Sequence, residues 1–309
     1  ARPGSEGPRL GRRGLATGAL SGLVDGALNV LGPALGFAAK AYAVLLVAVF
    51  ALQRKLIFLP DPAVADPAAQ GGAPDVITLP AASGQGEQAA AIYFRPKDPD
   101  GPVLVYFHGN ADQLGYGAAY LGNEFRGQYG LGLYGVEYPG YGLARPGSPS
   151  ESSIYSAAET MLRHLIDDLG VPASRIVLFG QSIGCAPAVE MARRGLGSRV
   201  VLLAPFTSMV DMATALYPFL KPALWLLPWM VLDRLDNKAK APEVVVPTLV
   251  VHGIEDEIVP VGMGEQLANA IKGAQLLRVP GMGHNDVFDR PEVLREVALF
   301  ALGSRKPTP

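Results

Sequence analysis

The sequence predicts an α/β fold built on a mostly parallel, eight-stranded sheet that helices cover on both faces. Short apolar runs alternate along the chain with longer stretches of helical pattern. Continuous apolar strands of this kind are typical of a parallel sheet whose two faces are both buried. A chain of 309 residues with 49% hydrophobic residues is large enough for one such core and an appendage.

Each element follows from a local pattern. The first two strands are expected to pair as a hairpin, and the later ones are separated by helices. Strands are predicted at residues 76–79, 90–95, 103–107, 131–136, 176–179, 200–203, 248–251 and 276–279. Helices are predicted at residues 113–126, 151–169, 183–194, 262–271 and 291–302.

The first 52 residues differ in composition from the remainder. Residues 1–30 form a Gly/Ala-rich leader, whose regularly spaced glycines fit either close helix packing in a membrane or a flexible segment. Leu31–Leu52 is almost wholly apolar, and about 20 such residues suffice to cross a bilayer. We predict one transmembrane helix there. A cleaved signal peptide fits less well, because no small-residue cleavage site follows Leu52.

The charges that flank this segment give an orientation. Four arginines precede it, which favours an N-terminus in the cytoplasm and a large domain on the non-cytoplasmic side. Arg54 and Lys55 on the other flank weigh against that assignment. The prediction is a single-pass membrane protein with its large domain outside.

Residues 53–302 are predicted to form the globular domain, and residues 303–309 a tail. One insertion, residues 206–240, interrupts the strand–helix alternation. Prolines divide it, so two or three short helices are expected to form a small cap. It carries Phe206 and both tryptophans, Trp225 and Trp229, which we predict to form an apolar substrate-binding wall. Core packing is the alternative.

The segment Gly180-Gln-Ser-Ile-Gly184 follows an apolar strand and precedes a helix. G-x-S-x-G in that position is the pattern of a nucleophile elbow, in which a strained turn exposes the serine. Strand and helix approach closely there, so the two flanking positions must be small, as Gly180 and Gly184 are. Ser182 is therefore the predicted nucleophile.

A serine nucleophile needs a base and an acid. His284 lies in a loop after the last strand and is the predicted general base, whereas His108 and His252 each end a strand and are expected to bond to backbone groups. The loop after residues 248–251 offers three carboxylates, Glu255–Glu257. Asp256 is the predicted acid that orients the histidine, and its neighbours are expected to be solvated.

An oxyanion hole needs two backbone N–H groups. Ile183, directly after the nucleophile, is predicted to supply one. The other is expected from the loop after residues 103–107, where Asn110 is the predicted donor and Ala111 the neighbouring possibility.

Composition excludes several classes of partner. The formal net charge of −2 gives no reason to expect nucleic acid. The one cysteine, Cys185, rules out an intramolecular disulfide and a cysteine metal cluster, and is expected to be a small core residue. No metal or organic cofactor is implied, and nothing in the sequence sets the oligomeric state.

Six motifs together resemble one branch of the α/β-hydrolase superfamily, the membrane-anchored serine hydrolases that act on acyl esters and protein palmitoyl thioesters. They are Tyr106-Phe-His-Gly-Asn-Ala111, Glu137-Tyr-Pro-Gly-Tyr-Gly142, Gly180-Gln-Ser-Ile-Gly184, Ala204-Pro-Phe-Thr-Ser208, His252-Gly-x-x-Asp-x-x-Val-Pro260 and Gly283-His-Asn-Asp286. The resemblance covers about residues 53–302. It implies an α/β-hydrolase fold, a triad of Ser182, Asp256 and His284, and an oxyanion hole from Ile183 and Asn110. Palmitoylated relatives carry N-terminal cysteines that this chain lacks, so the helix is its expected anchor.

The expected function is a serine hydrolase that cleaves carboxylic esters or thioesters of small-molecule or lipid-like acyl substrates at a membrane. Two alternatives remain. A prolyl-oligopeptidase-like serine peptidase shares the order Ser, Asp, His, but the chain has no propeller or other gating domain. A non-catalytic, membrane-tethered binding protein is opposed by the intact set of candidate catalytic residues.

Overall fold

The computed structural model describes residues 15–82 and 86–304 of the chain. By its internal contacts it divides into two units, Ala1–Leu52 and Gln53–Pro309. Parts of the predicted leader and tail, residues 1–14 and 305–309, lie outside the described residues.

One long helix, α1, runs from Leu15 to Ile57, starting in the first unit and ending in the second. Its segment Gly36–Ile57 has a mean hydropathy of 1.7, and only 6% of it is buried. By length and composition this segment can cross a membrane. The prediction placed the span at Leu31–Leu52, so the two ranges share residues 36–52; side chains before Gly36 lie outside the described part.

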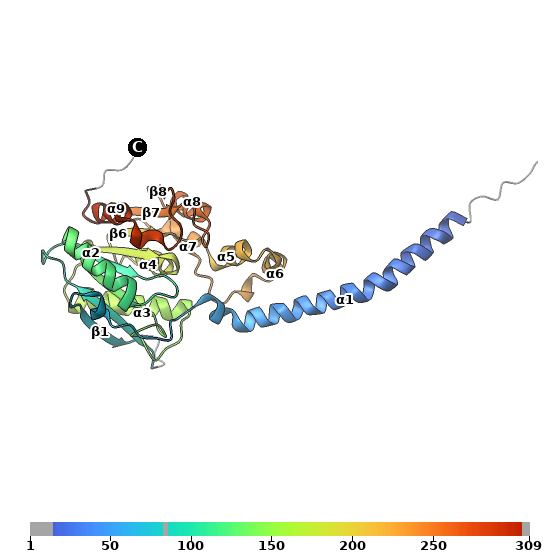
Figure 1. Ribbon diagram of the computed structural model, residues 1–309, viewed down its shortest axis with the longest axis horizontal. Helices are drawn as coiled ribbons and strands as arrows, with labels where there is room; N and C mark the ends of the chain where they lie inside the picture. The colour runs from blue at the N-terminus through green and yellow to red at the C-terminus, as the bar shows by residue number, and fades with distance from the viewer. Residues whose placement is uncertain (1–14, 83–85, 305–309) are drawn as a thin grey trace, which may run out of the picture. The chain divides into compact units, whose positions relative to one another are not determined.

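The second unit is organised around one eight-stranded sheet in the order β1-β2-β4-β3-β5-β6-β7-β8, as Figure 1 shows. β1 and β2 pair as the predicted antiparallel hairpin, β2 pairs antiparallel with β4, and the others are parallel. All eight strands lie where the sequence predicts them. They are β1 Asp75–Pro80, β2 Gln88–Phe94, β3 Val103–Phe107, β4 Gly132–Glu137, β5 Ile176–Gln181, β6 Arg199–Leu203, β7 Thr248–Gly253 and β8 Gln275–Val279.

Helices cover both faces of this sheet, because the apolar strands present side chains to each side. One core cluster joins one face to α3 Glu151–Arg163, α4 Cys185–Arg193 and α8 Val261–Ala270. The other joins the opposite face to α2 Ala119–Tyr129 and α9 Pro291–Ala301. Cys185 is buried in the first cluster, as expected of a core residue.

Short helical turns connect several of these elements. They are Pro67–Gln70, Leu114–Ala118, His164–Asp168, Ala173–Arg175, Ser182–Gly184, Pro218–Leu220, Pro228–Met230, Ala241–Glu243 and Asp286–Asp289.

The cap, residues 206–240, follows β6 and consists of short helices: α5 Met209–Leu216, α6 Lys221–Leu226 and α7 Asn237–Lys240. Ser208 starts α5, because its side chain accepts a hydrogen bond from the Asp211 N–H. Pro218, Pro222 and Pro228 each stand in the first turn of a new helical segment. Proline lacks the N–H that would continue the preceding helix, so the cap cannot form one long helix.

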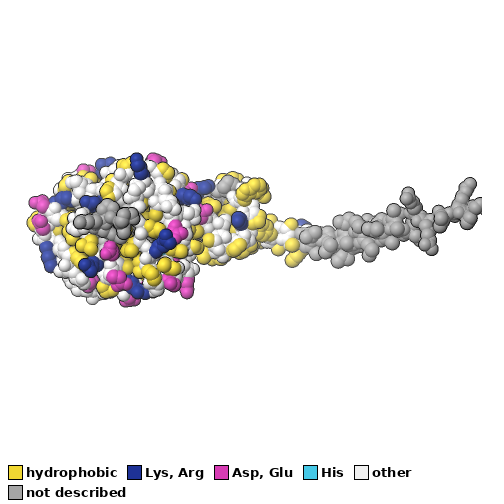
Figure 2. Space-filling model, turned by 90° about the horizontal axis from the view of Figure 1, so that it is seen from above, with side chains coloured by type: hydrophobic (Ala, Val, Ile, Leu, Met, Phe, Trp, Pro, Cys, Tyr) yellow, Lys and Arg dark blue, Asp and Glu magenta, His cyan; other side chains and the backbone are white. Residues whose placement is uncertain are grey.

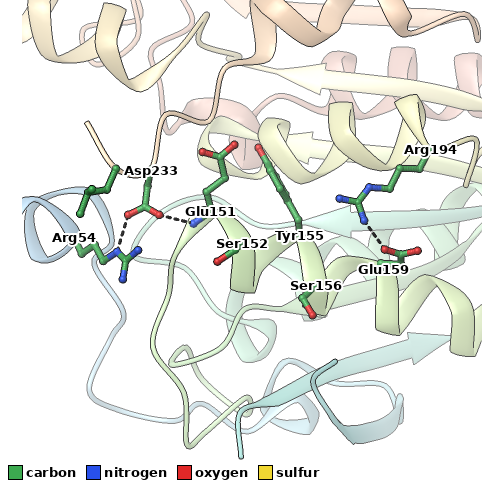
Figure 3. A pocket seen from close by; sticks show the side chains of 9 residues that line it. Arg54, Glu151, Ser152, Tyr155, Ser156, Glu159, Arg194 and Asp233 are labelled. Atoms are coloured by element: carbon green, nitrogen blue, oxygen red, sulfur yellow. Dashed lines mark hydrogen bonds and ion pairs between the residues drawn. The ribbon is translucent and has the colours of Figure 1, made fainter. Parts of the chain in front are cut away.

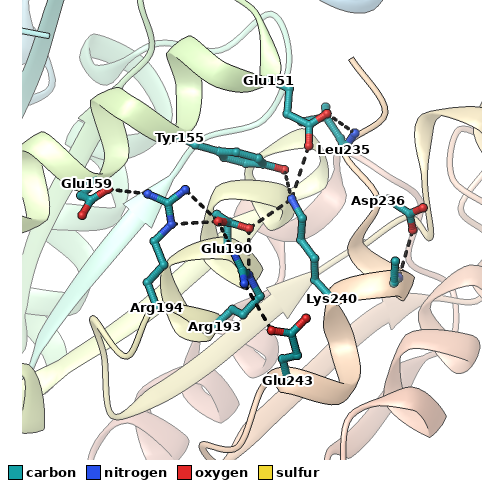
Figure 4. Close-up of polar contacts among 11 residues, drawn as sticks. Glu151, Tyr155, Glu159, Glu190, Arg193, Arg194, Leu235, Asp236, Lys240 and Glu243 are labelled. Atoms are coloured by element: carbon teal, nitrogen blue, oxygen red, sulfur yellow. Dashed lines mark hydrogen bonds and ion pairs between the residues drawn. The ribbon is translucent and has the colours of Figure 1, made fainter. Parts of the chain in front are cut away.

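A cluster of charged side chains ties the end of the cap to the sheet-covering helices, as Figure 4 shows. The Glu190 carboxylate on α4 is 3% exposed and lies 2.9 Å from Arg193, 2.8 Å from Arg194 and 3.2 Å from Lys240 on α7. Burial alone would raise the pKa of Glu190, but hydrogen bonds from the two arginines and Lys240 outweigh it and lower the pKa to about 2.

Candidate active site

Ser182 stands at the turn between β5 and α4, in the left-handed conformation at φ 52°. A Cβ at Gly180 would lie 2.4 Å from the Gly184 carbonyl oxygen, and one at Gly184 would lie 2.1 Å from the Phe107 carbonyl oxygen. No larger residue fits either position without moving the backbone. The strand–turn–helix elbow that the sequence predicts is therefore present.

His284 and Asp256 lie beside this serine, although 102 residues separate Ser182 from His284 in the chain. His284 Nε2 is 3.0 Å from Ser182 Oγ, and His284 Nδ1 is 2.8 Å from Asp256 Oδ2. The His284 side chain is 9% exposed and that of Asp256 is fully buried. The neighbouring Glu255 and Glu257 are exposed, as expected of solvated carboxylates.

Asp256 accepts hydrogen bonds from the backbone N–H groups of Ile258 at 2.9 Å and Val259 at 2.7 Å through Oδ1. Burial alone would raise the pKa of Asp256, but contacts with His252 and His284 and the Val259 N–H outweigh it and hold the pKa well below its usual range. The ionised carboxylate only accepts hydrogen bonds, so His284 must carry its proton on Nδ1. Nε2 is then free to accept the proton of Ser182.

His252, at the end of β7, is a member of this group that the sequence did not predict. Its Nε2 is 3.0 Å from the Val259 carbonyl oxygen, as expected of a histidine that bonds the backbone, and also 3.2 Å from Asp256 Oδ2. Both neighbours are acceptors, so Nε2 carries the proton. His252 is fully buried, and it contacts the same Asp256 oxygen, Oδ2, as His284 does.

The loops that carry Asp256 and His284 are joined to each other. The Glu255 N–H donates to the Met282 carbonyl oxygen at 3.2 Å. Asp286 accepts a hydrogen bond from the Gly283 N–H at 2.7 Å, which fixes the turn that presents His284. The segment Gly283-His-Asn-Asp286 is therefore held by a hydrogen bond within itself, which spans the histidine.

A second buried pair of side chains, His108 and Glu137, supports the loop after β3. His108 Nε2 lies 2.7 Å from Glu137 Oε1, and both side chains are fully buried. The contact is an ion pair when the His108 ring is protonated. Burial lowers the pKa of His108, but the charge of Glu137 outweighs it and raises the pKa above its usual value. The Tyr138 hydroxyl also donates to the His108 carbonyl oxygen at 2.8 Å.

The side chain of Asn110 joins this loop to the segment that follows α1. Its Nδ2 donates to the Ile57 carbonyl oxygen at 2.6 Å. Its Oδ1 accepts from the Leu59 N–H at 2.9 Å and from the Tyr141 hydroxyl at 2.8 Å. Asn110 was predicted for its backbone N–H, and the structure adds a separate role for its side chain. Ala111 beside it is left-handed, at φ 57°.

The three predicted substrate-binding residues lie in two environments. Phe206 is 1% exposed and belongs to a core cluster, whereas Trp225 and Trp229 are 81% and 66% exposed on the cap. Their assignment to a substrate wall stays a prediction.

A separate polar cavity of about 540 Å³ lies between α3 and the end of the cap, as Figure 3 shows. Asp233 is central to one wall: it pairs with Arg54 at 2.8 Å and accepts the Glu151 N–H at 2.8 Å. None of the residues that line this cavity belongs to the Ser182 group. Within residues 36–82 and 86–304, no three His, Cys, Asp or Glu side chains are grouped as metal ligands.

Comparisons with known proteins agree with this architecture. A family model described as "TAP-like protein" matches residues 229–297. The human "Alpha/beta hydrolase domain-containing protein 17B" is 30% identical over 205 residues, which are 66% of this chain and 67% of the human protein. The Caenorhabditis elegans "Alpha/beta hydrolase domain-containing protein aho-3" is 33% identical over 207 residues, which are 65% of this chain but only 57% of the nematode protein.

A solved structure shares the fold. The esterase Pf2001 of Pyrococcus furiosus superposes with a TM-score of 0.62 at 14% identity, covering 78% of this chain and 97% of the esterase. Sheet order, nucleophile elbow and sequence similarity converge, and the chain belongs to the α/β-hydrolase family.

Proposed function

We propose that this chain is a serine hydrolase that cleaves carboxylic ester or thioester bonds through an acyl-enzyme. The observation that carries the proposal is the continuous hydrogen-bonded relay from Ser182 through His284 to the buried Asp256, at 3.0 and 2.8 Å. This arrangement matches the geometry that serine hydrolysis needs, on a turn that exposes the serine.

The reaction proceeds in two steps. His284 Nε2 takes the Ser182 proton while Oγ attacks the substrate carbonyl, and Asp256 stabilises the imidazolium that forms. The backbone N–H groups of Ile183 and Asn110 hold the negative oxygen of the tetrahedral intermediate. His284 returns the proton to the leaving oxygen or sulfur, and then activates a water that releases the acid from Ser182.

The favoured substrates are lipid-like acyl esters or thioesters, and the site works at a membrane. The apolar segment Gly36–Ile57 supports anchoring, because it is long and apolar enough to cross a bilayer. The exposed apolar side chains of the cap support an apolar substrate. The non-cytoplasmic placement of the domain stays the prediction made from the flanking arginines.

A fluorophosphonate probe tests the chemistry directly, because it labels only an activated serine. The wild-type chain is expected to be labelled and Ser182→Ala to lose all labelling, while Ser208→Ala, a buried serine in the cap, is labelled normally. Undiminished labelling of Ser182→Ala would sink the proposal.

A series of acyl p-nitrophenyl esters and matching thioesters of increasing chain length tests the substrate class. We expect kcat/KM to rise with chain length, since each buried methylene contributes about 0.8 kcal/mol. A preference for acetyl over long chains would remove the lipid-like substrate and leave the serine chemistry intact.

A further inference from the structure

The cap exposes a large amount of apolar surface for part of a globular domain. Trp225 is 81% exposed, and Leu226 and Trp229 are each 66% exposed. Four more side chains, each about half exposed, complete what we call the cap patch: Leu216, Tyr217, Phe219 and Leu232. Figure 2 shows hydrophobic side chains gathered over the end of the second unit that carries α5 and α6. Exposed apolar patches of this kind mark surfaces for another molecule or a membrane.

The cap is fastened to the residues that directly follow the first unit. Gln53, which is 7% exposed, donates from Nε2 to the Met230 carbonyl oxygen at 3.1 Å and accepts the Leu232 N–H at 2.9 Å. Arg54 pairs with the buried Asp233 at 2.8 Å. The end of the membrane-spanning candidate is therefore hydrogen-bonded to the cap. Gln53 directly follows the predicted span Leu31–Leu52, so these hydrogen bonds join the cap to the first residue after that span.

The residues around the patch suit a bilayer interface. Tryptophan and tyrosine concentrate where acyl chains meet headgroups, and the patch holds both tryptophans of the protein and Tyr217. Lys221, which lies within the patch in sequence, and Lys55, two residues after Gln53, are both exposed, and such cations attract anionic headgroups. Protein partners do not require this combination of apolar side chains, cations and covalent continuity with a spanning segment.

We propose that the cap patch is a membrane-docking surface, which lies at the boundary between headgroups and acyl chains of the bilayer that holds α1. The patch is then a second membrane contact, distinct from the spanning helix. The inference rests on the membrane anchoring in the proposed function but not on the serine chemistry.

The sequence offers a direct probe of this surface, because its only two tryptophans both lie in the patch. The full-length chain is reconstituted into phosphatidylcholine–phosphatidylserine vesicles whose acyl chains are brominated at a shallow or a deep position. We expect blue-shifted tryptophan emission and stronger quenching by the shallow bromines, since interfacial segments sit about 5–10 Å into the boundary. Aqueous iodide is expected to quench little.

Single variants Trp225→Phe and Trp229→Phe assign the signal to each position. The control carries Val245→Trp in the Trp225→Phe/Trp229→Phe background. Val245 is 85% exposed and lies just before the amino end of β7, whereas the cap follows the carboxyl end of the parallel strand β6, so its emission is expected to be water-like and open to iodide.

Water-like emission from both native tryptophans, quenched by iodide as fully as the control, overturns the proposal. Blue-shifted emission that brominated lipids leave unquenched and that grows with protein density also overturns it, in favour of contact with a second copy of the chain. Fluorophosphonate labelling of the same vesicles reports the serine separately. Lost labelling with retained quenching contradicts the proposed hydrolase while leaving the docking surface in place.

Discussion

The turn at Ser182 and the cap follow neighbouring strands, β5 and β6, but they differ in how far their side chains are buried. Beside Ser182 the Asp256 carboxylate is buried and partnered: it has no exposed surface and contacts two histidines and two backbone N–H groups. On the cap, Trp225 and Trp229 are exposed. The contrast teaches that contacts within the fold hold the side chains of the candidate site in place. The exposed side chains of the cap have few such contacts, so their environment is set by solvent or by whatever binds there.

The largest effect is expected at the buried acid. Asp256→Asn keeps the shape but removes the charge that fixes the His284 tautomer and stabilises its cation, so kcat should fall by about 10⁴-fold. Ester hydrolysis measures this, with thermal unfolding as the check that the fold survives. A loss smaller than tenfold would show that Asp256 does not orient His284.

The loop after β3, which is the proposed source of an oxyanion donor, provides the next test. Asn110→Ala keeps the backbone N–H but removes the side-chain bonds to Ile57, Leu59 and Tyr141. We expect kcat to fall by about 10²-fold with KM little changed, because a displaced oxyanion donor acts in the transition state. Tyr141→Phe removes one of these bonds together with the bond from the Leu59 N–H to the Tyr141 hydroxyl, leaves the Asn110 contacts with Ile57 and Leu59 in place, and should cost much less. Equal losses in kcat from both variants would contradict the bracing role of the amide.

A buried charge on α4, which contacts the end of the cap through Lys240, separates stability from activity. Glu190→Gln removes the partner of three cations and should lower the free energy of unfolding by about 2 kcal/mol at neutral pH.

The pH dependence of this change has a definite sign. The folded pKa of Glu190, about 2, lies below its usual 4.5, so its stabilisation is present above pH 4.5 and is lost as the pH falls toward 2. The free energy of unfolding, measured with denaturant, should differ less and less between wild type and Glu190→Gln as the pH falls through that window. A difference that stays constant to pH 2 would show that the carboxylate charge is not its source.

The smallest effect is expected on the cap. Trp225→Ser should change the free energy of unfolding of the detergent-solubilised chain by no more than about 0.5 kcal/mol, because an exposed side chain leaves no cavity. Phe206→Ala, in the same cap but 1% exposed, should cost about 3–5 kcal/mol. If both variants lose a similar free energy of unfolding, Trp225 is buried against the protein in detergent solution and not exposed.

Local patterns in the sequence were enough for most of the fold. Apolar runs such as Val103–Phe107 and Ile176–Phe179 can only be buried strands once helical segments alternate with them, and all eight strands formed there. The elbow was also predictable, because the turn at Ser182 admits only glycine at positions 180 and 184. Hydrophobic periodicity and steric limits of this kind involve residues that are close in the chain, so they can be recognised in the sequence.

The sequence by itself determined the sheet, the elbow and the set of candidate residues on the strand-end loops. Tertiary structure decided which of them meet. It directed Asp256 inward and left Glu255 and Glu257 in solvent, set His252 against Asp256, and committed the Asn110 side chain to Ile57 and Leu59. The physical reason is that such contacts join segments far apart in the chain, so they follow from sheet order and loop closure rather than from local pattern.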